Sequence, residues 1–257
     1  MWHYRESGRG RPLILLHGIG MSGSAWNGVT PHLSASRRVI VFDIAGFGLT
    51  PPLPDGTPPT SGNLAAALER SVRALGLDGR VDIAGSSLGG LIALEAAKRG
   101  FARTVVAISP PGLWNAHPAL HVKYVFRTLR FLATRVPAAV RTVARIPALR
   151  ELAFAVPMSR GSRRMPADAA IGAIDDLACA TGFEDTFAST ASPFCGRRIA
   201  VPVTVAFGTR DWILLKHSRR RDALPAHTRW MTMPGWGHVP MWADPVGVAQ
   251  LILNGAQ

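Results

Sequence analysis

The pentapeptide Gly85-Ser86-Ser87-Leu88-Gly89 constrains the fold of this chain more than any other feature, because it joins a short apolar run to a helical stretch. Val81 to Ala84 precede it and the Ala- and Leu-rich segment 91–98 follows, so we expect a strand, a sharp turn and a helix in succession. A serine at the centre of such a turn is held in strained backbone geometry. The glycines two residues to either side are needed because a Cβ there would collide with the neighbouring strand or helix. Ser87 is therefore the candidate nucleophile.

Two downstream segments supply the partners that a nucleophilic serine needs, namely a base and a carboxylate that orients the base. The apolar run 201–207 predicts a buried parallel strand, which would leave Asp211 at its carboxyl end. A second short strand is expected over 228–233, before a glycine-rich loop that contains His238 and a final helix over 245–253. Asp211 and His238 are therefore the candidate acid and base.

An upstream loop can provide hydrogen-bond donors to the reacting oxygen. The apolar run 12–16 ends in His17-Gly18-Ile19-Gly20, a loop that can aim a backbone N–H at a developing oxyanion. Removing one such donor typically costs on the order of 100- to 1000-fold in rate. We assign this oxyanion hole to the amides of Leu88 and Ile19, with Gly20 as the alternative second donor. His17 is expected to brace the loop.

The order Ser87, Asp211, His238, with each residue after a predicted strand, differs from the order in chymotrypsin and in subtilisin. On these motifs the chain resembles the α/β-hydrolase superfamily, in its esterase and C–C hydrolase-like branch. The segment 43–48, Asp-Ile-Ala-Gly-Phe-Gly, is similar to the D-x-x-G-x-G loop of that family, where Asp43 would cap loop amides. The resemblance covers nearly the whole chain, weakly between about 112 and 193.

The resemblance and the alternation of apolar runs with helical stretches imply one fold class, α/β. We expect the α/β-hydrolase fold, with a mostly parallel sheet of about seven or eight strands flanked by helices. Family members often have an extra N-terminal strand, whereas this chain opens directly at Trp2, so we expect the sheet to be one strand short. After residue 111 the strand pattern stops and proline-broken helical segments follow. The predicted organisation is a core of residues 1–111 and 194–257, with a helical cap over 112–193.

The positive charge is concentrated in this predicted cap. Between 121 and 164 the chain has ten basic residues and one acidic residue, Glu151, out of a net +13 for the whole chain. An apolar helical face (Val122, Val125, Phe126, Leu129, Leu132, Val136) opposes a polar face (Lys123, Arg127, Arg130, Thr134). Three interpretations stay open: solvated arginines on a helix that covers the site, weak association with anionic membrane surfaces, and attraction for acidic substrates. No nucleic-acid reading motif is present, so a nucleic-acid partner is not expected.

The remaining composition favours an ordinary enzyme of one large domain. No signal-peptide pattern and no apolar run of about 18 residues occurs, so a cytoplasmic location is expected. Cys179 and Cys195 are expected to be unpaired and at least half-buried. His117 and His121 have no third ligand and the nucleotide-binding motifs are absent, so neither a metal nor a cofactor is expected. The oligomeric state stays open.

The resemblance implies hydrolysis of carboxylic esters through an acyl-enzyme at Ser87, with a small-molecule ester as substrate. A serine at this position argues against the haloalkane dehalogenase and epoxide hydrolase branches, which have aspartate there. The alternatives are lactone hydrolysis and C–C bond hydrolysis of the meta-cleavage-product type, in which Arg197 or Arg198 would hold a dienol acid. Outside the enzymes, a hydrolase-like ligand receptor is an alternative. The candidate pocket residues are Gly20, Trp114 and Trp212.

Overall fold

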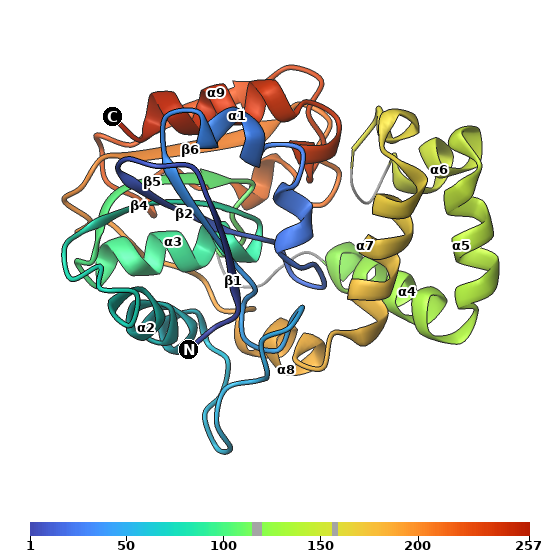
Figure 1. Cartoon of the computed structure of the whole chain (residues 1–257), viewed down its shortest axis with the longest axis horizontal. Coiled ribbons are helices and arrows are strands. Elements are labelled where there is room, and N and C mark those ends of the chain that lie inside the picture. The colour runs from blue at the N-terminus through green and yellow to red at the C-terminus, as the bar shows by residue number, and fades with distance from the viewer. Residues whose placement is uncertain (115–119, 156–158) are drawn as a thin grey trace.

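The computed structural model describes residues 1–114, 120–155 and 159–257 and is built around one seven-stranded sheet (Figure 1). The strand order is β1-β3-β2-β4-β5-β6-β7, and every neighbouring pair is parallel except β1 with β3. The strands are β1 (Tyr4–Ser7), β2 (Pro12–Leu16), β3 (Arg38–Phe42), β4 (Val81–Ser86), β5 (Ala102–Ile108), β6 (Val203–Gly208) and β7 (Arg229–Met233). The sheet of the described residues has seven strands, so the predicted number of about seven or eight is confirmed at its lower value.

Helices cover both faces of this sheet (Figure 1). One face is covered by α1 (Thr30–Ser34) and α9 (Pro245–Gly255), and the other by α2 (Ser61–Arg73) and α3 (Leu88–Lys98). The central strands contribute side chains to the apolar clusters on both faces of the sheet. In β2, Ile14 and Leu16 belong to one cluster, while Leu13 and Leu15 belong to the other. Burial on both faces explains why these strands are continuous apolar runs in the sequence.

Between β5 and β6 the described residues form helices and no strand. These helices are α4 (Leu120–Arg135), α5 (Pro137–Arg145), α6 (Pro147–Phe154), α7 (Ala167–Cys179) and α8 (Phe183–Ser189), with the short 3-10 helix η2 (Ser162–Arg164). Pro137 and Pro147 take the first position of α5 and α6, where a missing N–H costs nothing. Figure 1 shows α5 and α6 at the end of the molecule away from the sheet, with α7 between them and the core.

The packing of α4 differs from its predicted amphipathic pattern. Val122 is buried, as expected, but Leu132 is 39% exposed. Arg130, expected on the solvent face, instead lies with its guanidinium carbon 4.8 Å from the ring centroid of Phe183 and donates to the carbonyl of Leu177 at 2.9 Å. The reason is tertiary, because α7 and α8 pack against the side of α4 that carries Arg130.

No helix among the described residues combines the length and the apolar character that crossing a bilayer requires.

Cys179 and Cys195 are both free and exposed, so the expectation that they are at least half-buried is wrong. Both lie at the surface, where a small side chain has no apolar layer to fill.

Candidate active site

Ser87 lies in the turn between β4 and α3 and has the backbone geometry that its sequence motif requires. Its φ of 51° and ψ of −119° are strained for a residue with a side chain. A Cβ on Gly85 would lie 2.2 Å from the backbone of Gly89, and a Cβ on Gly89 would lie 2.3 Å from the carbonyl oxygen of Leu16. Both glycines are therefore needed so that strand, turn and helix can pack this closely.

The structure brings Ser87, His238 and Asp211 together in one hydrogen-bonded chain. The hydroxyl of Ser87 donates to Nε2 of His238 at 3.0 Å, and Nδ1–H of His238 donates to Asp211, with both carboxylate oxygens at 3.2 Å. The three residues are between 3% and 7% exposed. This arrangement requires a neutral imidazole protonated at Nδ1, which leaves Nε2 free to accept a proton.

The loops that carry His238 and Asp211 hold each other in place. The carbonyl of Trp236 accepts from the amide of Arg210 at 2.9 Å, and the indole N–H of Trp236 donates to Asp244 at 2.8 Å. Asp244 is also the N-cap of α9, where it accepts from the amide of Gly247. The start of α9 therefore fixes the loop that positions His238.

The carboxyl group of Asp211 stays ionised although it is buried. Burial alone would raise its pKa, but the neighbouring His238 ring and the amide N–H of Leu214 outweigh this and hold the pKa below its usual value. Asp211 Oδ1 accepts from the amides of both Ile213 and Leu214, at 3.0 and 2.9 Å. A buried carboxylate in this position stabilises a cationic imidazole.

The loop after β2 places Ile19 beside Ser87. Ile19 and Leu88 both line the same cavity as Ser87 and His238. Leu88 is the first residue of α3, so its N–H is one of the amides for which a helix has no internal acceptor. The two predicted amide donors therefore come from two separate segments, the loop after β2 and the start of α3, that meet at this cavity.

The ring of His17 holds this loop in place through hydrogen bonds to the backbone. Its Nδ1–H donates to the carbonyl of Gly18 at 2.8 Å, and its Nε2 accepts from the amide of Ile44 at 2.9 Å. Complete burial lowers the pKa of His17, so the ring is held neutral. Both ring nitrogens are occupied by the backbone, which leaves neither for a substrate.

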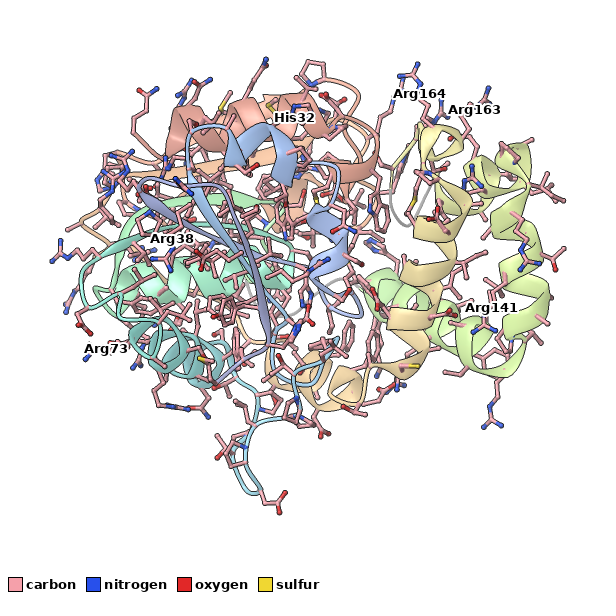
Figure 2. The ribbon with its side chains drawn as sticks, in the orientation of Figure 1. His32, Arg38, Arg73, Arg141, Arg163 and Arg164 are labelled. Carbon is pink, nitrogen blue, oxygen red and sulfur yellow. The ribbon has the colours of Figure 1, made fainter. Side chains whose placement is uncertain are left out.

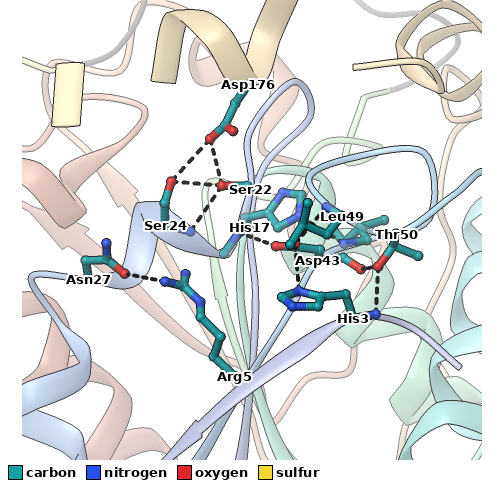
Figure 3. A network of polar contacts seen from close by, with 12 residues as sticks. His3, Arg5, His17, Ser22, Ser24, Asn27, Asp43, Leu49, Thr50 and Asp176 are labelled. Atoms are coloured by element: carbon teal, nitrogen blue, oxygen red, sulfur yellow. Dashed lines mark hydrogen bonds and ion pairs between the residues drawn. The ribbon is translucent and has the colours of Figure 1, made fainter. Parts of the chain in front are cut away.

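A polar network joins this loop to its neighbours (Figure 3). Asp43 accepts from the amides of Gly23 at 2.7 Å and Leu49 at 2.9 Å. Burial alone would raise the pKa of Asp43, but these two amides and the nearby His17 and His3 hold the pKa below its usual value. In the same network Asp176 of α7 accepts from two serine hydroxyls of the loop, Ser22 and Ser24. The loop is therefore fixed to the core through Asp43 and to α7 through Asp176.

The cavity beside Ser87 has a volume of about 50 Å³ and an apolar wall. Its lining comprises Ile19, Ser87, Leu88, Pro111, Trp114, Val122, Phe126, Phe187, Thr190, Ala191, Ile213, Leu214 and His238. Val122 and Phe126 come from α4, and Phe187 comes from α8. No lysine, arginine, aspartate or glutamate side chain lines it among the residues that the structure describes. The wall is suited to a small apolar group.

Of the three predicted pocket residues, one lines this cavity. Trp114 lines the cavity, whereas Gly20 packs against Leu177 and Phe183 outside it. Trp212 is 57% exposed and faces a separate surface hollow, so its prediction as a pocket residue needs correction.

The turn after Asp211 gives the physical reason for this correction. Because Ile213 N and Leu214 N both donate to the Asp211 carboxylate, the chain turns so that the side chains of Ile213 and Leu214 face the cavity. Trp212 consequently points outward. Residues 212–215 form a continuous apolar run, so the sequence contains no signal that separates the two lining residues from Trp212.

Other predicted residues lie away from the cavity. Arg197 is bonded to Asp222 at the surface, and Arg198 is also exposed. The ring of His121 lies 3.1 Å from the carbonyl oxygen of Ile213, and His117 is outside the described residues. Neither arginine is positioned to hold an acidic substrate beside Ser87.

A family model described as alpha/beta hydrolase fold matches residues 11–245. The chain belongs to the α/β-hydrolase fold family. Among its relatives in this family is the epoxide hydrolase EphH of Mycobacterium tuberculosis, 32% identical over 210 residues, which cover 76% of this chain and 94% of that protein. Another is the pimeloyl-[acyl-carrier protein] methyl ester esterase of Edwardsiella ictaluri, 28% identical over 267 residues, covering 95% of this chain and 92% of that one.

Solved structures of α/β hydrolases agree with the fold. The carboxylesterase CesB of Bacillus subtilis superposes with a TM-score of 0.72 at 20% identity, covering 98% of this chain and 86% of that one. A likeness at this identity concerns the fold alone. The relatives and this neighbour act as hydrolases under different names, so the substrate of this α/β hydrolase has to be argued from its own site.

Proposed function

We propose that this α/β hydrolase cleaves carboxylic esters through an acyl-enzyme on Ser87, with Asp211 and His238 completing a catalytic triad. The observation that carries the proposal is the unbroken path from Asp211 through His238 to the Ser87 hydroxyl, with its last link at 3.0 Å. A serine hydroxyl is a poor nucleophile by itself, and this path supplies the base that activates it.

In the proposed reaction, Oγ of Ser87 attacks the ester carbonyl carbon while its proton passes to Nε2 of His238. The protonated imidazole then donates that proton to the departing alkoxide, and the acyl group stays on Ser87. A water deprotonated by His238 attacks the acyl carbon in the second half, which releases the acid and restores the hydroxyl. Ionised Asp211 stabilises the imidazolium in both halves.

The amides of Leu88 and Ile19 are proposed to stabilise the negative oxygen of each tetrahedral intermediate. The support for this role is that both residues line the same cavity as Ser87. The positive end of α3 points at the same place, which adds to the stabilisation of an anion.

Residues 112–193 are proposed to form a cap over this site, with residues 1–111 and 194–257 as the core. The support is the origin of the cavity wall, to which α4 contributes Phe126 and α8 contributes Phe187. Because the cavity volume is about 50 Å³, we expect short or slender acyl groups to fit with these helices in their present positions.

The acidic dienol substrate of a C–C hydrolase would need a cation beside Ser87, but Arg197 and Arg198 lie away from the cavity. The apolar wall therefore favours an ester. A lactone is an internal ester and would follow the same steps. A serine nucleophile does not match the aspartate expected for epoxide opening, so the name of the mycobacterial relative is not transferred.

Hydrolysis of p-nitrophenyl esters, from acetyl to palmitoyl, tests the proposal with Ser87→Ala as the control. We expect turnover with an optimum at short chains, abolished in the variant. If the folded wild-type protein hydrolyses no ester, the proposal fails. Tight retention of an ester or lactone without turnover would instead indicate a ligand receptor.

A further inference from the structure

The outward faces of α4, α5 and α6, here called the outer layer, expose an unusual number of large apolar side chains. Of the twelve exposed large hydrophobic residues in the described part of the chain, eight belong to the outer layer or the junctions between its helices. They are Leu120, Tyr124, Phe131, Leu132, Val136, Ile146, Leu149 and Leu152. Scattered single apolar residues are ordinary on a surface, but a concentration on three consecutive helices indicates an interaction surface.

The outer layer and the connection that follows it carry positive charge that is not paired within the described residues. Six exposed cations have no ion pair with any described residue, three of them in the outer layer and three in the connection to α7. They are Lys123, Arg135, Arg145, Arg160, Arg163 and Arg164. Figure 2 shows Arg163 and Arg164 projecting from the edge of the molecule beside α6 and α7.

The one acidic residue of this stretch does not offset these cations at the surface. Glu151 accepts from the backbone amides of Gly161 at 2.8 Å and Arg163 at 3.0 Å, and its Oε2 also accepts from the hydroxyl of Ser162. Its carboxylate is thus turned into the loop that follows α6. Asp175 of α7 pairs with Arg141 of α5 at 2.7 Å, and the exposed Asp168 of α7 forms no ion pair with any of the six cations among the described residues.

We propose that the outer layer docks on an anionic lipid bilayer surface. Exposed aromatic and aliphatic side chains enter the boundary between head groups and acyl chains, while lysine and arginine side chains are attracted to the anionic head groups. A second copy of this chain would meet its own positive face, and a nucleic acid would leave residues such as Phe131 and Leu152 without an apolar partner. The combination of charge and apolar area fits lipid better than either.

The position of α4 relates this surface to the cavity. Val122 and Phe126 of α4 line the cavity, while Lys123 and Tyr124 on the same helix are exposed. Docking would therefore place one helix between the bilayer and Ser87. The surface would dock whether or not Ser87 acts as a nucleophile, because none of its residues takes part in the reaction.

Co-sedimentation with phosphatidylcholine vesicles, with and without phosphatidylglycerol, tests the proposal. We expect the wild-type protein and Ser87→Ala to sediment equally, only with the anionic vesicles, and to be released at about 1 M salt, where the Debye length is about 3 Å. The variant Lys123→Glu/Arg135→Glu/Arg145→Glu should partition roughly 100-fold more weakly. Replacing Tyr124, Phe131 and Leu152 together by serine should also weaken binding, since it removes the apolar contribution.

A charge-matched control separates docking from the effect of net charge. Arg9→Glu/Arg80→Glu/Arg229→Glu has the same net charge, but these exposed residues lie at the amino ends of β2, β4 and β7, on the opposite side of the molecule from the site. This control should bind as the wild type does. Equal loss in both charge variants, equal binding to neutral vesicles, or no binding by folded wild-type protein would overturn the proposal. Retention on duplex DNA is measured in parallel. If the variant Lys123→Glu/Arg135→Glu/Arg145→Glu loses retention on DNA but sediments with anionic vesicles as the wild type does, the proposal is also overturned. Circular dichroism and thermal unfolding establish that each variant is folded.

Discussion

The hydroxyl of Ser22 lies 2.7 Å from Oδ2 of Asp176, so helix α7 is hydrogen-bonded to the loop that carries Ile19 (Figure 3). Ser24 donates to the same carboxylate oxygen at 3.2 Å. A residue of the inserted helices thereby helps to fix a proposed oxyanion donor, although Asp176 does not line the cavity. Asp176 is a positioning residue in this arrangement.

Asp176→Ala is expected to lower kcat about tenfold for a soluble ester with little change in KM. A displaced donor weakens stabilisation of the transition state more than binding of the ground state, and its complete removal would cost on the order of 100-fold or more. The matched control is Asp175→Ala on the same helix, since Asp175 pairs with Arg141 at 2.7 Å within the inserted helices. A change of KM alone, or an equal effect in both variants, would show that Asp176 has only a structural role.

Removing the members of the proposed triad should have large and non-additive effects on ester hydrolysis. Ser87→Ala and His238→Ala are each expected to lower kcat by on the order of 10⁴-fold or more, and Asp211→Asn by roughly 10⁴-fold. The double variant lacking Ser87 and His238 should be no slower than either single one, because the residues act as a unit. Steady-state kinetics on p-nitrophenyl acetate measures this, and additive losses would contradict a shared mechanism.

Two glycine substitutions should have opposite effects on stability. Gly85→Ala puts a Cβ 2.2 Å from the backbone of Gly89, so we expect a loss of about 3 kcal/mol or more in the free energy of unfolding, or no folded protein. Gly172→Ala lies within α7 with no atom in the way, and should gain about 0.5–1 kcal/mol. Urea unfolding compares the two. Equal tolerance at both positions would mean that the turn at Ser87 is looser than the structure indicates.

The burial of neutral His17 predicts a dependence of stability on pH. Because its pKa is lowered in the folded state, the unfolded state binds the proton more readily once the pH falls below about 6.5. The contribution of His17 is therefore full above that pH and is lost as the pH falls toward the lower folded pKa. Thermal unfolding between about pH 7 and pH 5 should show a flatter pH dependence in His17→Gln than in the wild type. Exposed His32→Gln serves as the control, and an unchanged slope in His17→Gln would contradict the assignment.

Enlarging the cavity should shift the preferred ester to longer acyl chains. Phe126→Ala removes a ring from the wall of a cavity of about 50 Å³, so we expect kcat/KM for butyryl and hexanoyl esters to rise roughly tenfold relative to acetyl. Trp212→Ala, outside the cavity, should leave the ratio unchanged. If Trp212→Ala shifts the ratio and Phe126→Ala does not, the cavity described above is not the acyl site.

The features that could be predicted from the sequence are local ones. Gly85 and Gly89 encode a close approach of backbones, and any chain that turns there must omit a Cβ at both positions. Each of Ser87, Asp211 and His238 follows its own strand, and parallel strands bring their carboxyl ends to one edge of a sheet. Local chain direction was therefore enough to predict which residues would meet.

Tertiary packing alone decided which way individual side chains face. Trp212 points outward because the two following amides turn toward Asp211, and Arg130 points inward because α7 and α8 cover its side of α4. Leu132 has the apolar character of a core residue but is left exposed by the same packing. Sequence spacing fixes the angle between side chains along one element. Only the elements that pack against a helix or strand determine which of its side chains point into the core and which into solvent.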